Sequence, residues 1–245
     1  KSFFLVNLGF GALAAGKNVI HYSMELSETH VGNRYDSRIT GIPTKELRRR
    51  MVEAENELAR FNGGQLMIKE YPPKVATINT IKFHVGRLLS NGFDPDLIII
   101  DYGDLMKSRR GYEQKRFELE SVFEDLRAMS MELKLPIWTA TQSNRDGFND
   151  EIITIDKVGE AINKAHVVDF FGTFSQRKFH VGKNRMGSAN INFNIEMKPE
   201  CAHIELNDDQ SSGFSASDKL NSLLTGGGDS RSKIGNLYKS YKDGE

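Results

Sequence analysis

A run of four branched aliphatic residues constrains the fold of this chain more than any other feature. The run 97–100 reads Leu-Ile-Ile-Ile and is followed at once by Asp101. Without polar alternation, it predicts a strand buried on both faces, as in a parallel sheet covered by helices. A carboxylate at the end of such a strand lies at the edge where α/β sheets bind ligands. An aspartate that merely ends a strand is an equally good interpretation of this position alone.

The other patterns alternate between helix and strand. Apolar periodicity predicts helices over residues 3–15, 29–39, 45–61, 77–89, 116–134 and 159–165. Short apolar or alternating runs predict strands at 18–23, 66–68, 137–141 and 167–174, and a hairpin from 178–182 and 190–196. This order predicts an α/β fold, a mainly parallel twisted sheet flanked by helices, with a C-terminal β-hairpin. We assign 1–207 to this domain, and 208–245, rich in Ser, Asp, Lys and Gly, to a flexible polar tail.

Composition narrows the class of protein. The 245 residues contain 33 basic and 33 acidic side chains, so net charge gives no argument for nucleic-acid binding, and any such contact must be local. A single cysteine, Cys201, excludes an internal disulfide and a zinc site of paired cysteines. No apolar run approaches the roughly 18 residues of a membrane span, so no membrane association is expected. The first ten residues lack the layout of a signal peptide, and the chain starts at Lys1, which predicts a fragment or a processed product.

The dipeptide Lys1-Ser2 directly precedes an apolar helix. This context is typical of the end of a phosphate-binding loop, G-x-x-x-x-G-K-[ST], in which backbone amides and a helix N-terminus hold phosphates. In that interpretation the loop glycines would precede Lys1, which would contact the β- and γ-phosphates, while the Ser2 hydroxyl would bind Mg²⁺. Taken alone, a dipeptide is far more often an ordinary solvated start of a chain.

Two further polar side chains follow predicted strands. Glu25 follows the strand 18–23 and could polarise the water that attacks a γ-phosphate. Gln142 follows the strand 137–141, and its amide could sense the γ-phosphate through hydrogen bonds. A helix N-terminal glutamate favoured by the helix dipole, and a polar turn residue, are the simpler interpretations.

Lys183 and Arg185 are placed one residue apart at the tip of the predicted hairpin. On a strand they would point the same way, giving two cations able to hold one phosphate. The functional interpretation is an arginine finger acting across a subunit boundary, since the tip lies far along the chain from Lys1. An exposed basic turn without a specific role is the alternative.

Four segments carry a more specific signal through their order. They are 23–27 (SMELS), 100–106 (IDYGDLM), 141–145 (TQSNR) and 182–187 (GKNRMG). In this order the segments resemble successive motifs of the DnaB family of replicative DNA helicases, and 34–36 and 68–72 resemble its phage branch. The resemblance covers about residues 1–200 and leaves the tail unmatched.

The resemblance implies a RecA-like P-loop domain that forms a homo-hexameric ring and hydrolyses ATP, or another NTP, with Mg²⁺ between subunits. It implies translocation on single-stranded DNA and unwinding of duplex, in the cytoplasm of a bacterial or phage-infected cell. Primase and a helicase loader are the implied further partners, through parts absent from this chain.

Carried over position by position, the resemblance gives each candidate a role. Lys1, Ser2 and Asp101 would bind nucleotide, with Ser2 and Asp101 on the magnesium. Glu25 would be the catalytic base and Gln142 the γ-phosphate sensor, while Lys183 and Arg185 would act in trans. DNA would lie against loops near Arg145, Lys157 and Gly159, although the 156–159 segment departs from the family pattern.

Two alternatives stay open on the sequence alone. A recombinase of the RecA or RadA type would share the fold and the phosphate loop but form filaments. A nucleotide-gated oligomeric scaffold would need only the phosphate loop, with hydrolysis incidental. The trans cations and the 142–145 segment favour the ring helicase over the recombinase. Glu25, Gln142 and both trans cations argue against the scaffold.

Overall fold

The computed structural model describes residues 1–142, 161–175 and 178–207. These residues divide into two compact units, which we describe separately. The first unit comprises the described residues of 1–142, 161–167 and 197–204, and the second those of 168–196 and 205–207. The tail predicted at 208–245 lies outside the described residues, so the predicted boundary at residue 207 stays a prediction.

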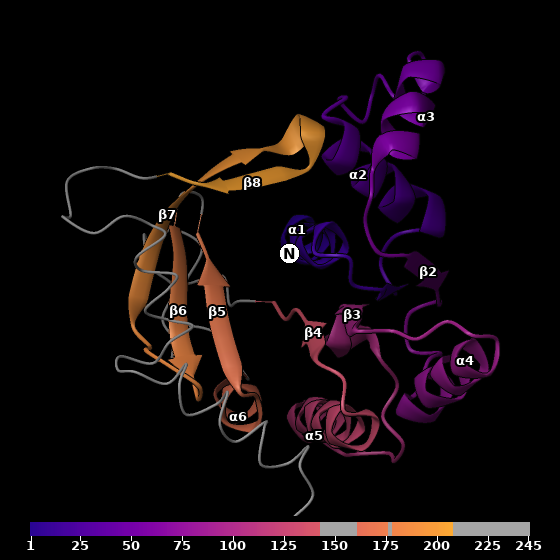
Figure 1. The fold of residues 1–245 in the computed structure, drawn as a ribbon. Helices are drawn as coiled ribbons and strands as arrows, with labels where there is room; N and C mark the ends of the chain where they lie inside the picture. The colour runs from indigo at the N-terminus through magenta and orange to yellow at the C-terminus, as the bar shows by residue number, and fades with distance from the viewer. Residues whose placement is uncertain (143–160, 176–177, 208–245) are drawn as a thin grey trace, which may run out of the picture. The chain divides into compact units, whose positions relative to one another are not determined.

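A four-stranded parallel sheet forms the centre of the first unit (Figure 1). Its order is β2 (Leu66–Glu70), β1 (Val19–Ser23), β3 (Leu97–Asp101) and β4 (Ile137–Thr139). All residues of β1 and β3 are buried, as the apolar run in β3 predicts. The register pairs Ser23 with Asp101, so the carboxyl ends of β1 and β3 meet at one edge.

Helices cover both faces of this sheet. Helices α1 (Ser2–Ala14) and α2 (Glu28–Thr40) lie on one side, and α4 (Ile78–Ser90) and α5 (Lys115–Leu133) lie on the other (Figure 1). Strand β3 contributes alternate side chains to the two resulting cores. Ile98 and Ile100 pack with α4 and α5, whereas Leu97 and Ile99 pack with α1 and α2. The predicted α/β fold with a parallel sheet is therefore confirmed.

Helix α1 is held closely against α2 through a glycine. A Cβ atom at Gly9 would lie 2.0 Å from the Tyr35 hydroxyl oxygen, closer than any side chain permits. Tyr35 is 1% exposed, and its hydroxyl is 3.0 Å from His21 Nδ1 in β1. The absence of a side chain at Gly9 thus lets α1, α2 and β1 meet around one buried tyrosine.

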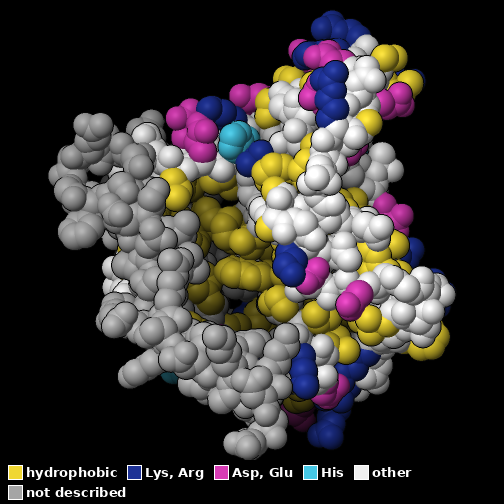
Figure 2. All heavy atoms as spheres, in the orientation of Figure 1, with side chains coloured by type: hydrophobic (Ala, Val, Ile, Leu, Met, Phe, Trp, Pro, Cys, Tyr) yellow, Lys and Arg dark blue, Asp and Glu magenta, His cyan; other side chains and the backbone are white. Residues whose placement is uncertain are grey.

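Helix α3 (Met51–Arg60) is shorter than the sequence predicts. The prediction of a helix over 45–61, with Met51 on its buried side, is wrong at its start: residues 44–50 form turns and Met51 is 58% exposed. Leu47 and Ala54 are the buried apolar contacts of this region instead. On the face drawn in Figure 2, basic and acidic side chains are interspersed over α3 rather than gathered into a patch of one sign.

Most of an antiparallel sheet belongs to the second unit, while residues 197–198 and 203–204 of its last two strands are assigned to the first. The sheet runs in the order β5 (Phe170–Phe174), β6 (Lys178–Asn184), β7 (Ile191–Lys198) and β8 (His203–Leu206). Strands β6 and β7 form the predicted hairpin with longer strands than expected, and β8 was not predicted. Phe179 of β6 stacks on Phe170 and Phe193 of the neighbouring strands, which gives this sheet an aromatic face.

Residues 197–204 belong to the first unit and are fixed to it by hydrogen bonds. Asn7 of α1 donates to the Ala202 carbonyl at 2.8 Å and accepts from the Ile204 amide at 3.1 Å. The Thr44 amide donates to the Glu200 carbonyl at 2.9 Å. The segment after β7 is thus anchored beside the first helix.

Among the described residues, no helix is both long enough and apolar enough to cross a membrane.

Candidate nucleotide-binding and catalytic site

The phosphate side of the candidate site is the N-terminus of α1. The helix begins at Ser2, and the Phe4 and Leu5 amides bond back to the Lys1 carbonyl at 3.0 and 3.2 Å. The Lys1 ammonium lies 3.8 Å from the centre of the Tyr102 ring, directly after the end of β3. A helix N-terminus beside a lysine is an arrangement suited to binding an anion.

Asp101 ends β3 in a fully buried position, 0% exposed. Neither of its carboxylate oxygens has a hydrogen-bond partner of normal geometry within the part of the chain that the structure describes. Burial raises the pKa of the Asp101 carboxyl; the nearby Ser2 hydroxyl, which favours the charged form, opposes this without completing such a bond. A buried carboxylate without partners is costly and fits a site that binds a cation.

Glu25 lies two residues beyond β1, and its side chain is exposed. Its carboxylate is close enough to act on Asp101, whose pKa it raises further, and on Tyr102, whose pKa is raised first by burial. The ends of β1 and β3 are joined directly, because the Met24 amide donates to the Asp101 carbonyl at 2.8 Å. Glu25 therefore stands at the open side of the same sheet edge.

Gln142 follows β4 and reaches the same place. Its Nε2 donates to the Tyr102 hydroxyl at 3.3 Å. The position of β4 is fixed by Thr139, whose hydroxyl accepts from the Gly103 amide at 2.8 Å and donates to the Ile100 carbonyl at 2.9 Å. Tyr102 is thus the common neighbour of Lys1 and Gln142.

Five predicted residues therefore gather at one edge of the sheet. They come from the start of α1 and from the carboxyl ends of three parallel strands, and they are Lys1, Ser2, Glu25, Asp101 and Gln142. An anion-binding helix end, a buried carboxylate, an exposed carboxylate and an amide lie together. That set of groups can bind a phosphate-bearing ligand with a cation and polarise a water beside it.

Comparison with known proteins identifies the family. Residues 1–151 match the family model described as DnaB-like helicase C terminal domain. This chain belongs to that family. The match favours the DnaB-type helicase motor over the recombinase alternative and confirms the resemblance found in the sequence.

Relatives and solved structures agree with this membership. The DnaB-like replicative helicase of Enterobacteria phage T4 is 26% identical over 185 residues, covering 69% of this chain and 38% of the relative. A probable plasmid replicative DNA helicase of Chlamydia muridarum is 28% identical over 189 residues, covering 72% and 42%. This chain thus spans about two fifths of the length of these relatives.

Two solved structures share the fold. One, described as an ATPase domain, superposes with a TM-score of 0.72 at 14% identity, covering 83% of this chain and 79% of that one. A DnaB-like replicative helicase, described with its interactions with primase, superposes with a TM-score of 0.69 at 15% identity, covering 82% and 55%. At these identities the superpositions support the fold alone.

The DnaB-like domain carries its two predicted trans cations on the second unit. Lys183 lies within β6, so its predicted place at the hairpin tip is wrong: β6 continues to Asn184. Arg185 is the first residue after β6, and its guanidinium is 3.0 Å from the Asp169 carboxylate, while its amide donates to the Asp169 carbonyl at 2.9 Å. We call the sheet edge with Lys1, Ser2, Glu25, Asp101 and Gln142 the nucleotide edge. That Lys183 and Arg185 act on a nucleotide at this edge of a neighbouring subunit stays a prediction.

The predicted DNA-binding residues are not described by the structure, and two residues near the candidate site were not predicted. The predicted DNA contacts Arg145, Lys157 and Gly159 lie outside the described residues. No sequence pattern singled out Tyr102 as the shared neighbour, nor Lys164, which is buried beside Asp104. Tyr102 does directly follow the strand-ending aspartate, a signal that could have found it.

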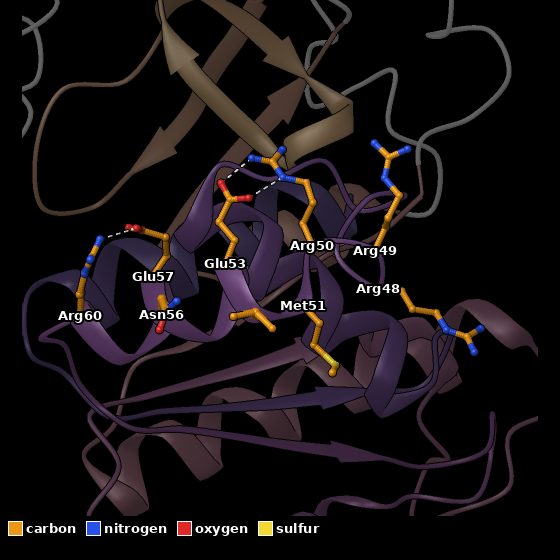
Figure 3. Close-up of a pocket in the computed structure, with 9 residues that line it drawn as sticks. Arg48, Arg49, Arg50, Met51, Glu53, Asn56, Glu57 and Arg60 are labelled. Carbon is orange, nitrogen blue, oxygen red and sulfur yellow. Dashed lines mark hydrogen bonds and ion pairs between the residues drawn. The ribbon is translucent and has the colours of Figure 1, made fainter.

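A hollow lies over α3 and the turns before it in the DnaB-like domain (Figure 3). Its lining is rich in arginine, but Arg50, directly before the helix, pairs with Glu53, and Arg60 pairs with Glu57. Pairs three residues apart are typical of a solvated helix face. None of the predicted nucleotide-binding residues lines the hollow, and we therefore place the candidate site at the sheet edge.

Proposed function

We propose that this chain is the motor domain of a ring helicase that hydrolyses ATP between subunits and moves along single-stranded DNA. The observation that carries the proposal is the convergence of Lys1, Asp101, Glu25 and Gln142 at the carboxyl edge of one parallel sheet. Membership in the DnaB-like family supports the choice of reaction. The family match also supports binding of a nucleoside triphosphate, and we propose ATP as that nucleotide.

Lys1 and the N-terminus of α1 would bind the β- and γ-phosphates. Ser2 and Asp101 fit a magnesium site, because the Asp101 oxygens are buried without partners among the described residues. Within those residues no group of three His, Cys, Asp or Glu could hold a metal unaided, which suits an ion also bound by phosphates. When bound, Mg²⁺ would supply positive charge to the phosphate oxygens.

Glu25 would accept a proton from the water that attacks the γ-phosphorus. As the water oxygen bonds to phosphorus, the bond to the β–γ bridging oxygen breaks and ADP leaves. Gln142 would contact the γ-phosphate, so that its position differs between the triphosphate and diphosphate states. Lys183 and Arg185 of a neighbouring subunit would stabilise the charge on the transferred group, a role that elsewhere contributes factors of about 10³–10⁵.

The wider context is proposed on the same basis. A homo-hexamer would place each sheet edge beside a neighbour's hairpin, and DNA contacts near Arg145, Lys157 and Gly159 would follow phosphates without regard to sequence. A solved relative is described with its interactions with primase, and we propose primase and a helicase loader as partners through other parts of the protein. The site of action would be the cytoplasm of a bacterial or phage-infected cell.

The test uses the full-length protein and its Glu25→Gln variant. ATP hydrolysis is measured with and without single-stranded DNA, and binding of a fluorescent ATP analogue is measured in parallel. We expect DNA to stimulate hydrolysis, and Glu25→Gln to lower the rate by about 100-fold or more with binding changed little, because only the proton acceptor is lost. A hydrolysis rate that does not change when DNA is added would point to the nucleotide-gated scaffold. A Glu25→Gln variant as fast as wild type would do the same and would remove Glu25 from the mechanism.

A further inference from the structure

A closed triangle of polar groups lies beside the Gln142 end of β4. Lys164 of α6 (Ala161–Val167) donates to Asp104 Oδ1 at 2.7 Å and to the Thr141 hydroxyl at 3.0 Å. The Thr141 hydroxyl in turn donates to Asp104 Oδ2 at 2.7 Å. We call Lys164, Asp104 and Thr141 the β4–α6 triad. All three belong to the first unit.

Lys164 is buried, and its two partners are partly buried. The Lys164 side chain is 4% exposed and that of Asp104 is 15% exposed. The Lys164 ammonium also lies 5.2 Å from the centre of the Phe123 ring in α5. Desolvating such an ion pair offsets most of its attraction, so a pair of this kind contributes little net stability compared with apolar side chains. What it does provide is one fixed arrangement of the three segments that it joins.

Each segment bears on the nucleotide edge. Thr141 directly precedes Gln142, and Asp104 lies three residues after Asp101, in the short helix η1 (Gly103–Leu105). Within the part of the chain that the structure describes, the Gln142 side chain is held near that edge by its 3.3 Å bond to Tyr102, a long contact for an exposed side chain. Helix α6 is held to α5 by a bond from Arg127 to the Val167 carbonyl. The triad therefore links an anchored helix to the residue next to Gln142.

We propose that Lys164 is a positioning residue for Gln142. Through Thr141 and Asp104 it fixes the end of β4, so that the Gln142 amide meets a γ-phosphate in one place and any shift of that amide is passed to α6. This inference rests on the proposed function, since it assumes that Gln142 contacts a γ-phosphate. Lys164 itself touches no reacting atom.

The most informative variant removes the link to β4 and leaves the ion pair intact. Thr141→Val deletes the hydroxyl that both Lys164 and Asp104 contact, whereas Thr141→Ser keeps it. In the full-length protein we expect Thr141→Val to lower kcat for ATP by about 10–100-fold, since misplacement of about 1 Å can cost 10²-fold. Thr141→Ser should restore most of the rate.

A second pair of variants separates positioning from stability. Lys164→Met with Asp104→Leu removes both charges without leaving one buried alone. Arg109→Met with Asp125→Leu is the control, because that pair, bonded at 2.9 Å between Arg109 Nε and Asp125, joins a loop to α5 rather than to the triad; Arg109 is more exposed than Lys164. The triad variant should lose activity as Thr141→Val does, and the control should keep wild-type kcat.

The decisive readout is discrimination of the γ-phosphate, which does not require hydrolysis. The affinities for a non-hydrolysable ATP analogue and for ADP are measured for each protein. We expect Thr141→Val to lose about 10-fold in the ratio of the two, with ADP affinity changed less than about threefold. Wild-type kcat and wild-type discrimination in Thr141→Val would overturn the inference, even if the Lys164 double variant failed to fold. A wild-type protein that neither hydrolyses ATP nor distinguishes it from ADP would instead overturn the proposed function itself.

Discussion

Asp101 is a candidate site residue whose burial weakens the fold. Its carboxyl is buried, and burial raises its pKa from the ordinary value of 3.8. The ionised form is therefore disfavoured in the folded state. The resulting loss of stability grows as the pH rises from 3.8 towards the raised pKa, and it disappears as the pH falls below 3.8. A cation at the site would remove the same cost, which fits the proposed magnesium role.

Asp101→Asn should accordingly melt at a higher temperature than wild type at pH 7, with the difference shrinking in acid. The same change should lower ATP hydrolysis by about 100-fold or more, because metal-ion catalysis contributes several kcal/mol. Thermal melts from pH 7 to pH 3 and a hydrolysis assay measure both effects. Asp96→Asn is the control of opposite sign: the Asn18 amide and Lys17 lower the pKa of Asp96, so this variant should lose stability at pH 7. A destabilised Asp101→Asn would contradict the role given to this carboxylate.

His21 gives a separate test of the buried core around β1. Burial, with a smaller contribution from Arg34, lowers its pKa from 6.5 to about 3. The folded state therefore holds a neutral imidazole, while the unfolded chain binds a proton below pH 6.5. Stability due to this group is complete above pH 6.5 and is lost as the pH falls towards 3, at about 1.4 kcal/mol per pH unit.

His21→Asn keeps a hydrogen-bonding group near Tyr35 and removes the titration. Denaturant unfolding at pH 7, 6, 5 and 4 should show a shallower acid loss in the variant by about that slope. Parallel curves for the two proteins would mean that another group dominates the acid sensitivity.

At the scale of elements, the packing of α1 depends on the close approach of Gly9 to Tyr35 of α2 rather than on an amphipathic pattern. Gly9→Ala would force a Cβ against the Tyr35 hydroxyl and should destabilise the protein by about 1–3 kcal/mol, the usual cost of overpacking a core. Gly11→Ala, on the same helix, meets nothing within 4 Å and should be neutral or stabilising by up to about 1 kcal/mol. Unfolding midpoints of the two variants give the comparison, and equal effects would show that helix propensity, not packing, decides.

Elements with a strong local signal could be predicted from the sequence. The apolar run before Asp101 and the long periodic helix after residue 115 both form where expected. The start of α3 could not, because Pro43-Thr44 opens a series of turns rather than the helix itself. Strand β8 has four residues and pairs with β7, the strand directly before it in the chain; a run this short is too brief for an alternating pattern to predict a strand.

Some residues at the candidate site could be predicted from the sequence, and others could not. Lys1, Glu25, Asp101 and Gln142 could be predicted because the ends of parallel strands meet at one edge whatever the side chains between them. Lys164 could not, since a lone lysine on a short helix is ordinarily a solvated one. Its burial follows from tertiary contacts with Asp104 and Thr141.

At the scale of the whole molecule, the proposed mechanism requires a catalytic site shared between subunits. Glu25 belongs to the first unit and Arg185 to the second. In the proposed mechanism, Glu25 of one subunit acts together with Arg185 of its neighbour on the same nucleotide. Isolated subunits should therefore hydrolyse ATP poorly. Salt should weaken the stimulation by DNA, because DNA contacts would be made to phosphates.

The central claim is tested most directly by mixing two inactive proteins. Full-length Glu25→Gln and Arg185→Ala subunits are assembled separately and together, and ATP hydrolysis is measured in the presence of single-stranded DNA. If the residues act across the boundary, a random equal mixture has about one quarter of its interfaces intact and should regain hydrolysis in that proportion. A mixture as inactive as its two components would place both residues in one subunit and contradict the claim.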